Sequence, residues 1–177
     1  MSEYTKENNS FIGYEYKDVT IDKSMESVYT DAYQNFGWSL DDISSPISGI
    51  NSIALKFKRD RKIRNKAELT RLQRQFDSYA SEVLSMERSK IGSASLVAYS
   101  VGLVGTACLA GSTFAFLGGL IPLCIVLAIP GFVGWILPYF LYNSTYAKKS
   151  AKLSPLIEKK YDEIYDVCER GNSLIEN

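Results

Sequence analysis

The polar and apolar positions of this 177-residue chain divide it into three regions. Charged side chains occur throughout residues 1–90 and 148–177, whereas the 57 consecutive residues 91–147 contain none. A bilayer core of about 30 Å needs roughly 20 residues of helix to cross it. The uncharged stretch is too long for one crossing and too short for three crossings with turns. It therefore predicts two membrane-spanning helices.

The turn between these helices is predicted at residues 117–122, where Gly118 and Gly119 precede Pro122. Glycine commonly ends a helix, and proline is tolerated in the first turn of the next one. We expect transmembrane helices at 92–116 and 121–143. The alternative is a buried hairpin in a soluble protein, but only 120 residues lie outside the uncharged stretch to cover it.

Basic side chains flank the uncharged stretch on both sides. Arg88 and Lys90 precede it, Lys148, Lys149 and Lys152 follow it, and the turn carries no charge. Lys and Arg accumulate on the cytoplasmic side of membrane proteins. We therefore expect a multi-pass protein of the cytoplasmic membrane, with the lipid bilayer as a partner and both termini in the cytoplasm.

One side of the first span carries hydroxyl and small side chains, which makes it a candidate helix-packing or pore face: Ser95, Tyr99, Gly102, Thr106 and Thr113. An overlapping stripe of small residues would allow close helix approach: Ala94, Ala98, Gly102, Thr106 and Ala110. In the second span, Pro130 and Gly131 form a candidate hinge. Neither span holds an ionisable Asp, Glu, Lys or Arg, which argues against an ion-coupled transporter or an intramembrane protease.

The N-terminal region predicts a small folded unit. Residues 1–13 are mostly polar and predict disorder. Residues 14–60 predict a β-α-β unit with a strand at 14–21, a helix at 25–36, a loop at 38–52 and a strand at 53–58. The helix has an apolar stripe at Met25, Val28, Tyr29, Ala32, Tyr33 and Phe36. Two strands and one helix bury little surface, so this unit must dock on another element.

Two further cytoplasmic helices are predicted next to the spans. Residues 62–90 carry a seam typical of a coiled coil: Leu69, Leu72, Phe76, Tyr79, Val83 and Met86. A C-terminal helix is expected at 150–175, with Ser154 and Pro155 as its cap and first turn. The short turn between the spans should make these helices an antiparallel stalk. The seam could instead join copies of the chain, and we expect a homo-oligomer.

A basic cluster at residues 56–66 has seven Lys or Arg and one Asp, whereas residues 1–55 have three Lys and nine acids. The candidate partner-binding side chains are Lys58, Arg59, Arg61, Lys62 and Arg64. The cluster could pair with the acidic N-terminal unit, or bind a nucleotide, RNA or acidic protein. Lipid binding would require the helix to lie on the membrane, because about 24 helical residues, or roughly 36 Å, separate Lys66 from it.

The sequence offers little chemistry for catalysis. It contains no histidine, and it lacks the nucleophile-elbow, phosphate-loop, zinc-protease and EF-hand motifs. Its formal net charge is zero, which makes nucleic acid an unlikely partner of the whole chain. We expect no enzyme activity, no catalytic residues, no metal site and no cofactor.

Three segments carry a resemblance to known proteins: residues 55–76, 128–140 and 159–169. Through them the chain resembles an uncharacterised family of small two-pass membrane proteins of Gram-positive bacteria. The layout is also loosely similar to SLATT-type two-pass effectors, which are thought to form pores. The first resemblance implies a bacterial membrane location and topology only, and neither transfers functional residues.

The expected fold is a mainly α membrane protein with a two-helix transmembrane hairpin, a cytoplasmic helical stalk and a small β-α-β unit. The expected function is non-enzymatic: an oligomeric protein of the cytoplasmic membrane that presents its stalk to a cytoplasmic protein partner. The alternatives are a small oligomeric channel or pore and, with less support, an accessory subunit of a membrane transporter.

Overall fold

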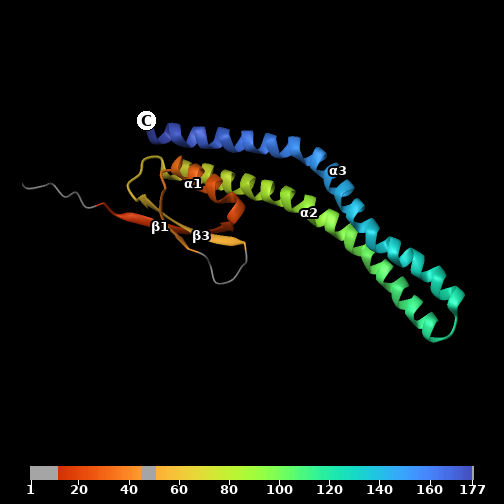
Figure 1. Cartoon of the computed structure of the whole chain (residues 1–177). Coiled ribbons are helices and arrows are strands. Elements are labelled where there is room, and N and C mark those ends of the chain that lie inside the picture. Colours follow the sequence, from red (N-terminus) through yellow and green to blue (C-terminus); the bar gives the residue numbers. More distant parts are fainter. Residues whose placement is uncertain (1–11, 45–50, 177) are drawn as a thin grey trace, which may run out of the picture. The chain divides into compact units, whose positions relative to one another are not determined.

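The computed structural model describes residues 12–44 and 51–176. The predicted disordered segment 1–13 lies almost entirely outside them, as does part of the predicted loop 38–52. The elements, in chain order, are β1 (Tyr14–Asp22), the 3-10 turn η1 (Lys23–Met25), α1 (Glu26–Gln34), β2 (Ser39–Ser44), β3 (Ser52–Asp60), α2 (Lys66–Leu117) and α3 (Ile121–Glu176) (Figure 1).

The contacts divide the chain into two units, which we describe separately. The first, called the head here, contains the strands, α1, the first turns of α2 up to Tyr79 and the part of α3 from Asp162 onward. The second, called the hairpin, contains residues 80–161, which are the rest of α2, the connecting turn and the first part of α3.

The sheet of the head is antiparallel, with strand order β1-β3-β2. β1 pairs with β3 along its whole length, from Tyr14 opposite Asp60 to Asp22 opposite Ser52. The predicted β-α-β unit is therefore wrong, because the sheet is built from three strands and β2 occupies part of the predicted loop. The acidic residues that suggested a loop face β3, where Lys58 pairs with Asp41 and Lys56 with Asp42.

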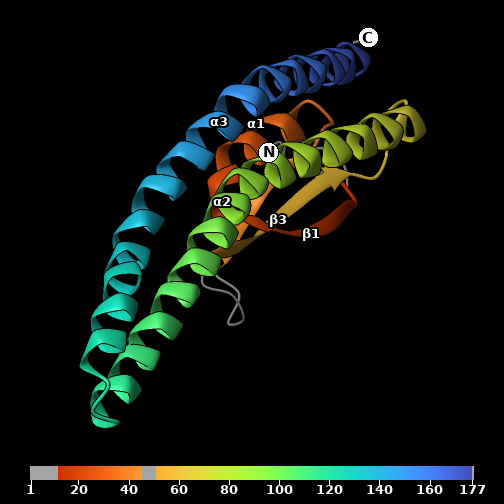
Figure 2. The ribbon, with the colours of Figure 1, turned by 90° about the vertical axis from the view of Figure 1, so that its right-hand side faces the viewer.

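One face of this sheet is covered by helices, and the core of the head lies between them (Figure 2). Four residues of the predicted apolar stripe are buried: Met25, Ala32, Tyr33 and Phe36. Tyr33 stacks on Phe57 of β3 with ring centroids 4.4 Å apart, and Phe76 of α2 meets Tyr29 edge-on at 5.0 Å. Burial of these aromatic rings supplies much of the free energy that holds the head together.

The end of α3 completes the head. A Cβ on Gly171 would lie 2.7 Å from the carbonyl oxygen of Asn35 and 2.8 Å from the ring of Phe36, so only glycine fits there. The side-chain amide of Asn65 donates to the carbonyl of Leu174 at 3.4 Å. The C-terminal turns of α3 are thus tied to both α1 and the start of α2.

Both long helices are continuous through segments that were given separate bounds. For α2 this agrees with the predicted seam, which runs directly towards the first span. The predicted helices 62–90 and 92–116 form one helix, α2, and those at 121–143 and 150–175 form α3. Ser154 and Pro155 do not start a new helix, because α3 continues through Pro155 as it does through Pro130 and Pro138. No glycine lies between the second span and Pro155 to end the helix, and a proline inside a helix can kink it without ending it.

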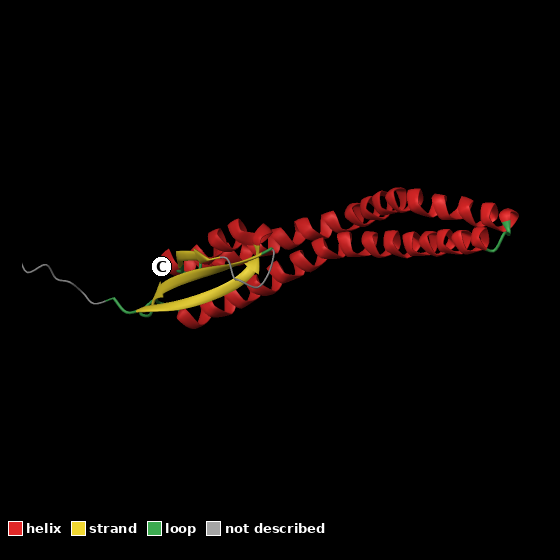
Figure 3. Cartoon of the chain, turned by 60° about the horizontal axis from the view of Figure 1, so that its bottom comes forward, coloured by secondary structure: helices red, strands yellow, loops and turns green. Residues whose placement is uncertain are grey.

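The turn between α2 and α3 lies where the glycines predicted it (Figure 3). Gly119 has a φ of +75°, a conformation that favours glycine, and the N–H of Leu120 donates to the carbonyl of Ala115 at 3.0 Å. This bond caps the end of α2. The prediction of two long apolar helices joined by a short turn is confirmed.

Candidate functional site

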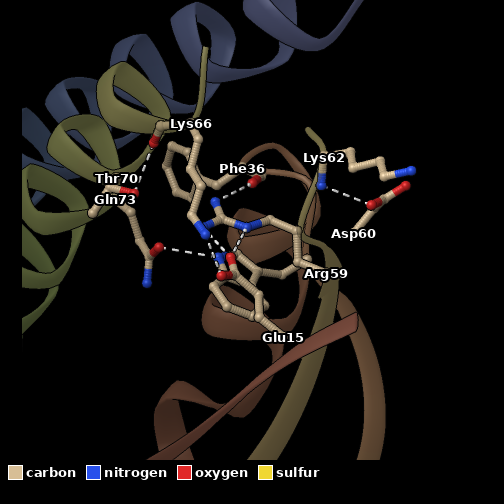
Figure 4. A network of polar contacts seen from close by, with 9 residues as sticks. Glu15, Phe36, Arg59, Asp60, Lys62, Lys66, Thr70 and Gln73 are labelled. Atoms are coloured by element: carbon tan, nitrogen blue, oxygen red, sulfur yellow. Dashed lines mark hydrogen bonds and ion pairs between the residues drawn. The ribbon is translucent and has the colours of Figure 1, made fainter. Parts of the chain in front are cut away.

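One side chain of the predicted basic cluster, Arg59, is buried within a network of polar contacts (Figure 4). Arg59 is only 3% exposed. Its Nε and one terminal nitrogen bind the carboxylate of Glu15, at 2.7 and 2.5 Å, and its other terminal nitrogen donates to the carbonyl of Phe36 at 3.2 Å. The guanidinium also lies 4.2 Å above the ring of Trp38. Each of its three guanidinium nitrogens therefore has a partner inside the head.

Glu15 and Gln73 extend this network to α2. Glu15 receives a second cation, the ammonium of Lys66, and Trp38 donates its indole N–H to Gln73 at 3.0 Å. Burial alone would raise the pKa of Glu15, but the hydrogen bonds and charges of Lys66 and Arg59 outweigh it and hold that pKa below its usual value. One carboxylate thus joins β1, β3 and the first turn of α2.

Lys58 also has interaction partners within the head. Its ammonium lies 2.7 Å from Asp41 across the sheet and 5.9 Å from the ring of Tyr14. The hydrogen bond to Asp41 raises the pKa of Lys58. Unlike Arg59, Lys58 lies on the open face of the sheet, where its side chain keeps about a third of its exposure.

The remaining predicted partner-binding residues lie in the segment between β3 and α2. Arg61, Lys62 and Arg64 are all exposed. The carboxylate of Asp60 accepts the backbone N–H of Lys62 at 2.8 Å, which shapes this turn and leaves the side chain of Lys62 outside it. A shallow pocket of about 380 Å³ opens beside Glu15, and its lining includes Lys17, Lys66 and Arg74. This end of the head therefore gathers exposed cations.

A second polar network, which the sequence did not predict, crosses the core of the head. Tyr33 donates its hydroxyl proton to Asp77 of α2 at 3.1 Å, and Lys17 of β1 donates to the same tyrosine oxygen at 3.1 Å. Burial raises the pKa of Asp77, although the charge of Lys17 and the bond from Tyr33 reduce the shift. Burial and Asp77 together raise the pKa of Tyr29 to about 12.

The hydroxyls of the predicted packing or pore face bond mainly to their own helix. Thr106 donates to the carbonyl of Gly102 at 2.9 Å, and Thr113 donates to that of Leu109 at 3.0 Å. Tyr99 is 77% exposed, and Ser95 is half-buried. These residues share a helix side, but the two threonine hydroxyls have their protons engaged.

The closest approach of α2 and α3 in the hairpin uses glycines that the sequence did not single out. A Cβ on Gly134 would lie 2.7 Å from the Cα of Gly105, and one on Gly105 would lie 2.9 Å from the Cα of Gly134. The predicted small-residue stripe passes one position beside this crossing, and of its members only Ala94 is fully buried. Small residues recur every seven positions at Ala98, Gly105 and Ser112, and this pattern could have pointed to Gly105 as a packing position.

Pro130 and Gly131, the candidate hinge, lie inside the continuous helix α3. Gly131 is buried, and a Cβ there would lie 2.6 Å from the side chain of Leu109 on α2. Close packing therefore explains the glycine at this position. Whether α3 bends here during function stays a prediction.

Most large apolar side chains of the hairpin point outward. Leu96, Phe114 and Trp135 are each more than 60% exposed, and α2 and α3 are both long and apolar enough to cross a membrane. Within residues 12–44 and 51–176, no group of three or more His, Cys, Asp or Glu side chains could hold a metal ion. Comparisons with protein-family models, curated proteins and solved structures found no match.

Proposed function

We propose that this chain is a non-enzymatic two-pass protein of the cytoplasmic membrane. The hairpin lies in the bilayer, and the head binds a partner protein in the cytoplasm. The proposal has two parts, membrane insertion and partner binding, which rest on different residues and are tested separately.

The exposed apolar surface of the hairpin supports the first part of the proposal, membrane insertion. Burying a large apolar side chain gains about 1.5 to 3 kcal/mol relative to leaving it in water. The hairpin leaves many such residues exposed along both helices, and extensive exposed apolar surface marks contact with a membrane or partner. The exposed set includes Leu96, Leu103, Val104, Phe114, Phe116, Ile125, Val126, Ile129, Phe132, Trp135, Ile136 and Phe140.

Tyrosine and lysine side chains at one end of the hairpin support its insertion and orientation. Tyr139, Tyr142 and Tyr146 lie at the end of the uncharged stretch that adjoins Lys148 and Lys149, whereas residues 100–134 contain no Trp or Tyr. Aromatic rings with a polar tip favour the membrane interface, and Lys and Arg favour its cytoplasmic side. The tyrosines mark this end of the hairpin as a membrane interface, and the lysines beside it favour the cytoplasmic side.

Cysteine labelling tests insertion and orientation. We expect Leu120→Cys, in a chain whose native cysteines are replaced by alanine, to react with a membrane-impermeant thiol reagent in intact cells. Leu120 suits this test because it lies in the turn and is 56% exposed. Tyr165→Cys, at a 72% exposed position of the head, should react only after lysis. Labelling of Tyr165→Cys in intact cells would contradict the orientation, and recovery of the chain in water without detergent would contradict insertion.

The exposed cations of the head support the second part, an acidic partner. Arg59 is excluded as a contact residue because it is buried, so the candidate surface consists of the exposed side chains of Arg61, Lys62 and Arg64 in the segment between β3 and α2. Charge on such a surface steers association and selects partners of opposite charge. A pore has less support, because the hydroxyls of Thr106 and Thr113 already donate to their own helix.

Charge reversal tests this surface. We expect the double variant Arg61→Glu and Lys62→Glu to reduce partner capture about tenfold or more in cells, measured by crosslinking and mass spectrometry. The matched control is Lys23→Glu with Arg170→Glu, which makes the same charge change at exposed positions of the head. Equal capture by both double variants would contradict the proposed surface.

A further inference from the structure

A further cluster of polar groups lies at the basic end of the hairpin. Lys149 of α3 places its ammonium between two serine hydroxyls of α2, 3.2 Å from Ser89 and 2.6 Å from Ser93. Ser89 and Ser93 are four residues apart, so they lie on one side of α2. The three side chains form a small donor site shared by both helices.

The charge of this site has no carboxylate to balance it. Among the described residues, no Asp or Glu oxygen lies within 4.0 Å of the ammonium of Lys149, although Lys149 and Ser93 are partly buried. The nearby Lys90 differs, because it pairs with Glu87 at 2.8 Å. Each serine that accepts from Lys149 still has its own hydroxyl proton to donate, and the ammonium has a third N–H.

This arrangement fits an oxyanion. Two hydroxyl donors and an ammonium within hydrogen-bond distance of one another suit a phosphate group, whose oxygens accept several charge-assisted hydrogen bonds. Lys148 and Lys152 are exposed on the same helix and raise the local positive potential. The position favours a lipid, because Ser93 and Lys149 each lie two residues from an end of the uncharged stretch. Basic pockets between membrane helices on the cytoplasmic side bind acidic headgroups.

We propose that Lys149, Ser89 and Ser93 bind the phosphate group of an anionic phospholipid of the cytoplasmic leaflet. The inference rests on the proposed membrane insertion and adds a specific ligand site to it. It differs from general attraction between lysines and acidic lipids, because it assigns one lysine and two hydroxyls rather than the total charge.

Lipid retention tests the site. The full-length chain is exchanged from vesicles of phosphatidylcholine with phosphatidylglycerol into mild detergent, and bound lipid is counted by native mass spectrometry. We expect Lys149→Met to lower phosphatidylglycerol retention about tenfold, and Ser89→Ala with Ser93→Ala to lower it while Lys149 is kept. The control, Lys148→Met, removes the same charge from the neighbouring exposed position and should retain the lipid.

The other outcomes are distinct. Equal loss in Lys148→Met and Lys149→Met, or no loss in either, would overturn the site and leave membrane insertion intact. Displacement of the lipid by inorganic phosphate at matched concentration would overturn the lipid assignment in favour of a free phosphate. A chain that needs no detergent would overturn the proposed function itself.

Discussion

Replacing Arg59 with methionine will destabilise the head by about 2 to 3 kcal/mol, because it removes the side-chain donor to the carbonyl of Phe36 and one of the two cations that bind Glu15. Methionine keeps most of the volume of the side chain, so the loss measures the polar contacts more than packing. The stability of a domain is only about 5 to 15 kcal/mol, so this single change removes a large share of it.

The two tryptophans allow the effect to be assigned to the head. Trp38 lies against Arg59 in the head, and Trp135 lies in the hairpin. In a Trp135→Phe background, urea unfolding followed by Trp38 fluorescence should shift to a much lower midpoint in Arg59→Met.

The control is Lys58→Met, which removes the neighbouring positive charge from the exposed face of the same strand. Exposed ion pairs contribute little, so its midpoint should stay close to that of the unmodified chain. Similar shifts in both variants would show that the cluster acts through its total charge and not through the buried contacts of Arg59.

The different roles of Arg59 and its neighbours could have been predicted from the period of the strand. Ile53, Leu55 and Phe57 alternate inward, and extension of the strand by two residues places Arg59 on the same side. The strand predicted from this alternation ended at residue 58, and the three residues that follow, Arg59, Asp60 and Arg61, are all charged. The inward position of Arg59 was therefore missed. In a charged segment, the sequence does not distinguish a buried arginine that has a carboxylate partner from a solvated one.

The third strand could not be predicted for a related reason. The segment that forms β2 has neighbouring aspartates and no regular alternation, and its register shifts between Leu40 and Asp42. Its strand conformation depends on pairing with β3, which includes the ion pairs of Asp41 and Asp42. Pairing between distant segments has no local signature. The same holds for the contact of Tyr33 with Asp77, whose partners are 44 positions apart.

The hairpin was predictable because its signal is local and strong. A stretch free of charge over 57 residues, with an adjacent pair of glycines at its middle, limits the chain to few arrangements. What the pattern could not give is the rotation of each helix about its axis. That rotation decides which of several small residues lie at the crossing, and it depends on how both helices pack together.

The second large effect is expected where α2 and α3 cross, at Gly105 and Gly134. Gly134→Ala will destabilise the hairpin by about 2 to 3 kcal/mol or more, because the new Cβ lies 2.7 Å from the Cα of Gly105 and no side chain can move to relieve the contact. The helices must separate locally, and the neighbouring contacts weaken with them. These include the bond from the indole N–H of Trp135 to the hydroxyl of Thr106 at 3.3 Å.

Gly102→Ala is the matched control, since it adds the same methyl group to α2 within one turn of Gly105. Its Cβ would meet only the ring of Pro138 at 3.8 Å, an ordinary contact, so stability should be unchanged or slightly increased. Titration of the detergent-solubilised chain with dodecyl sulfate, followed by the emission of Trp135, measures the difference.

The double variant Gly105→Ala with Gly134→Ala separates crossing geometry from the intrinsic properties of glycine. Substitutions that disrupt one shared contact are not additive, so the double variant should cost little more than Gly134→Ala alone. Additive losses would mean that the two glycines act independently along their own helices. Equal losses in Gly102→Ala and Gly134→Ala would mean that any added methyl group harms this hairpin and that the close approach of Gly105 and Gly134 does not hold it together.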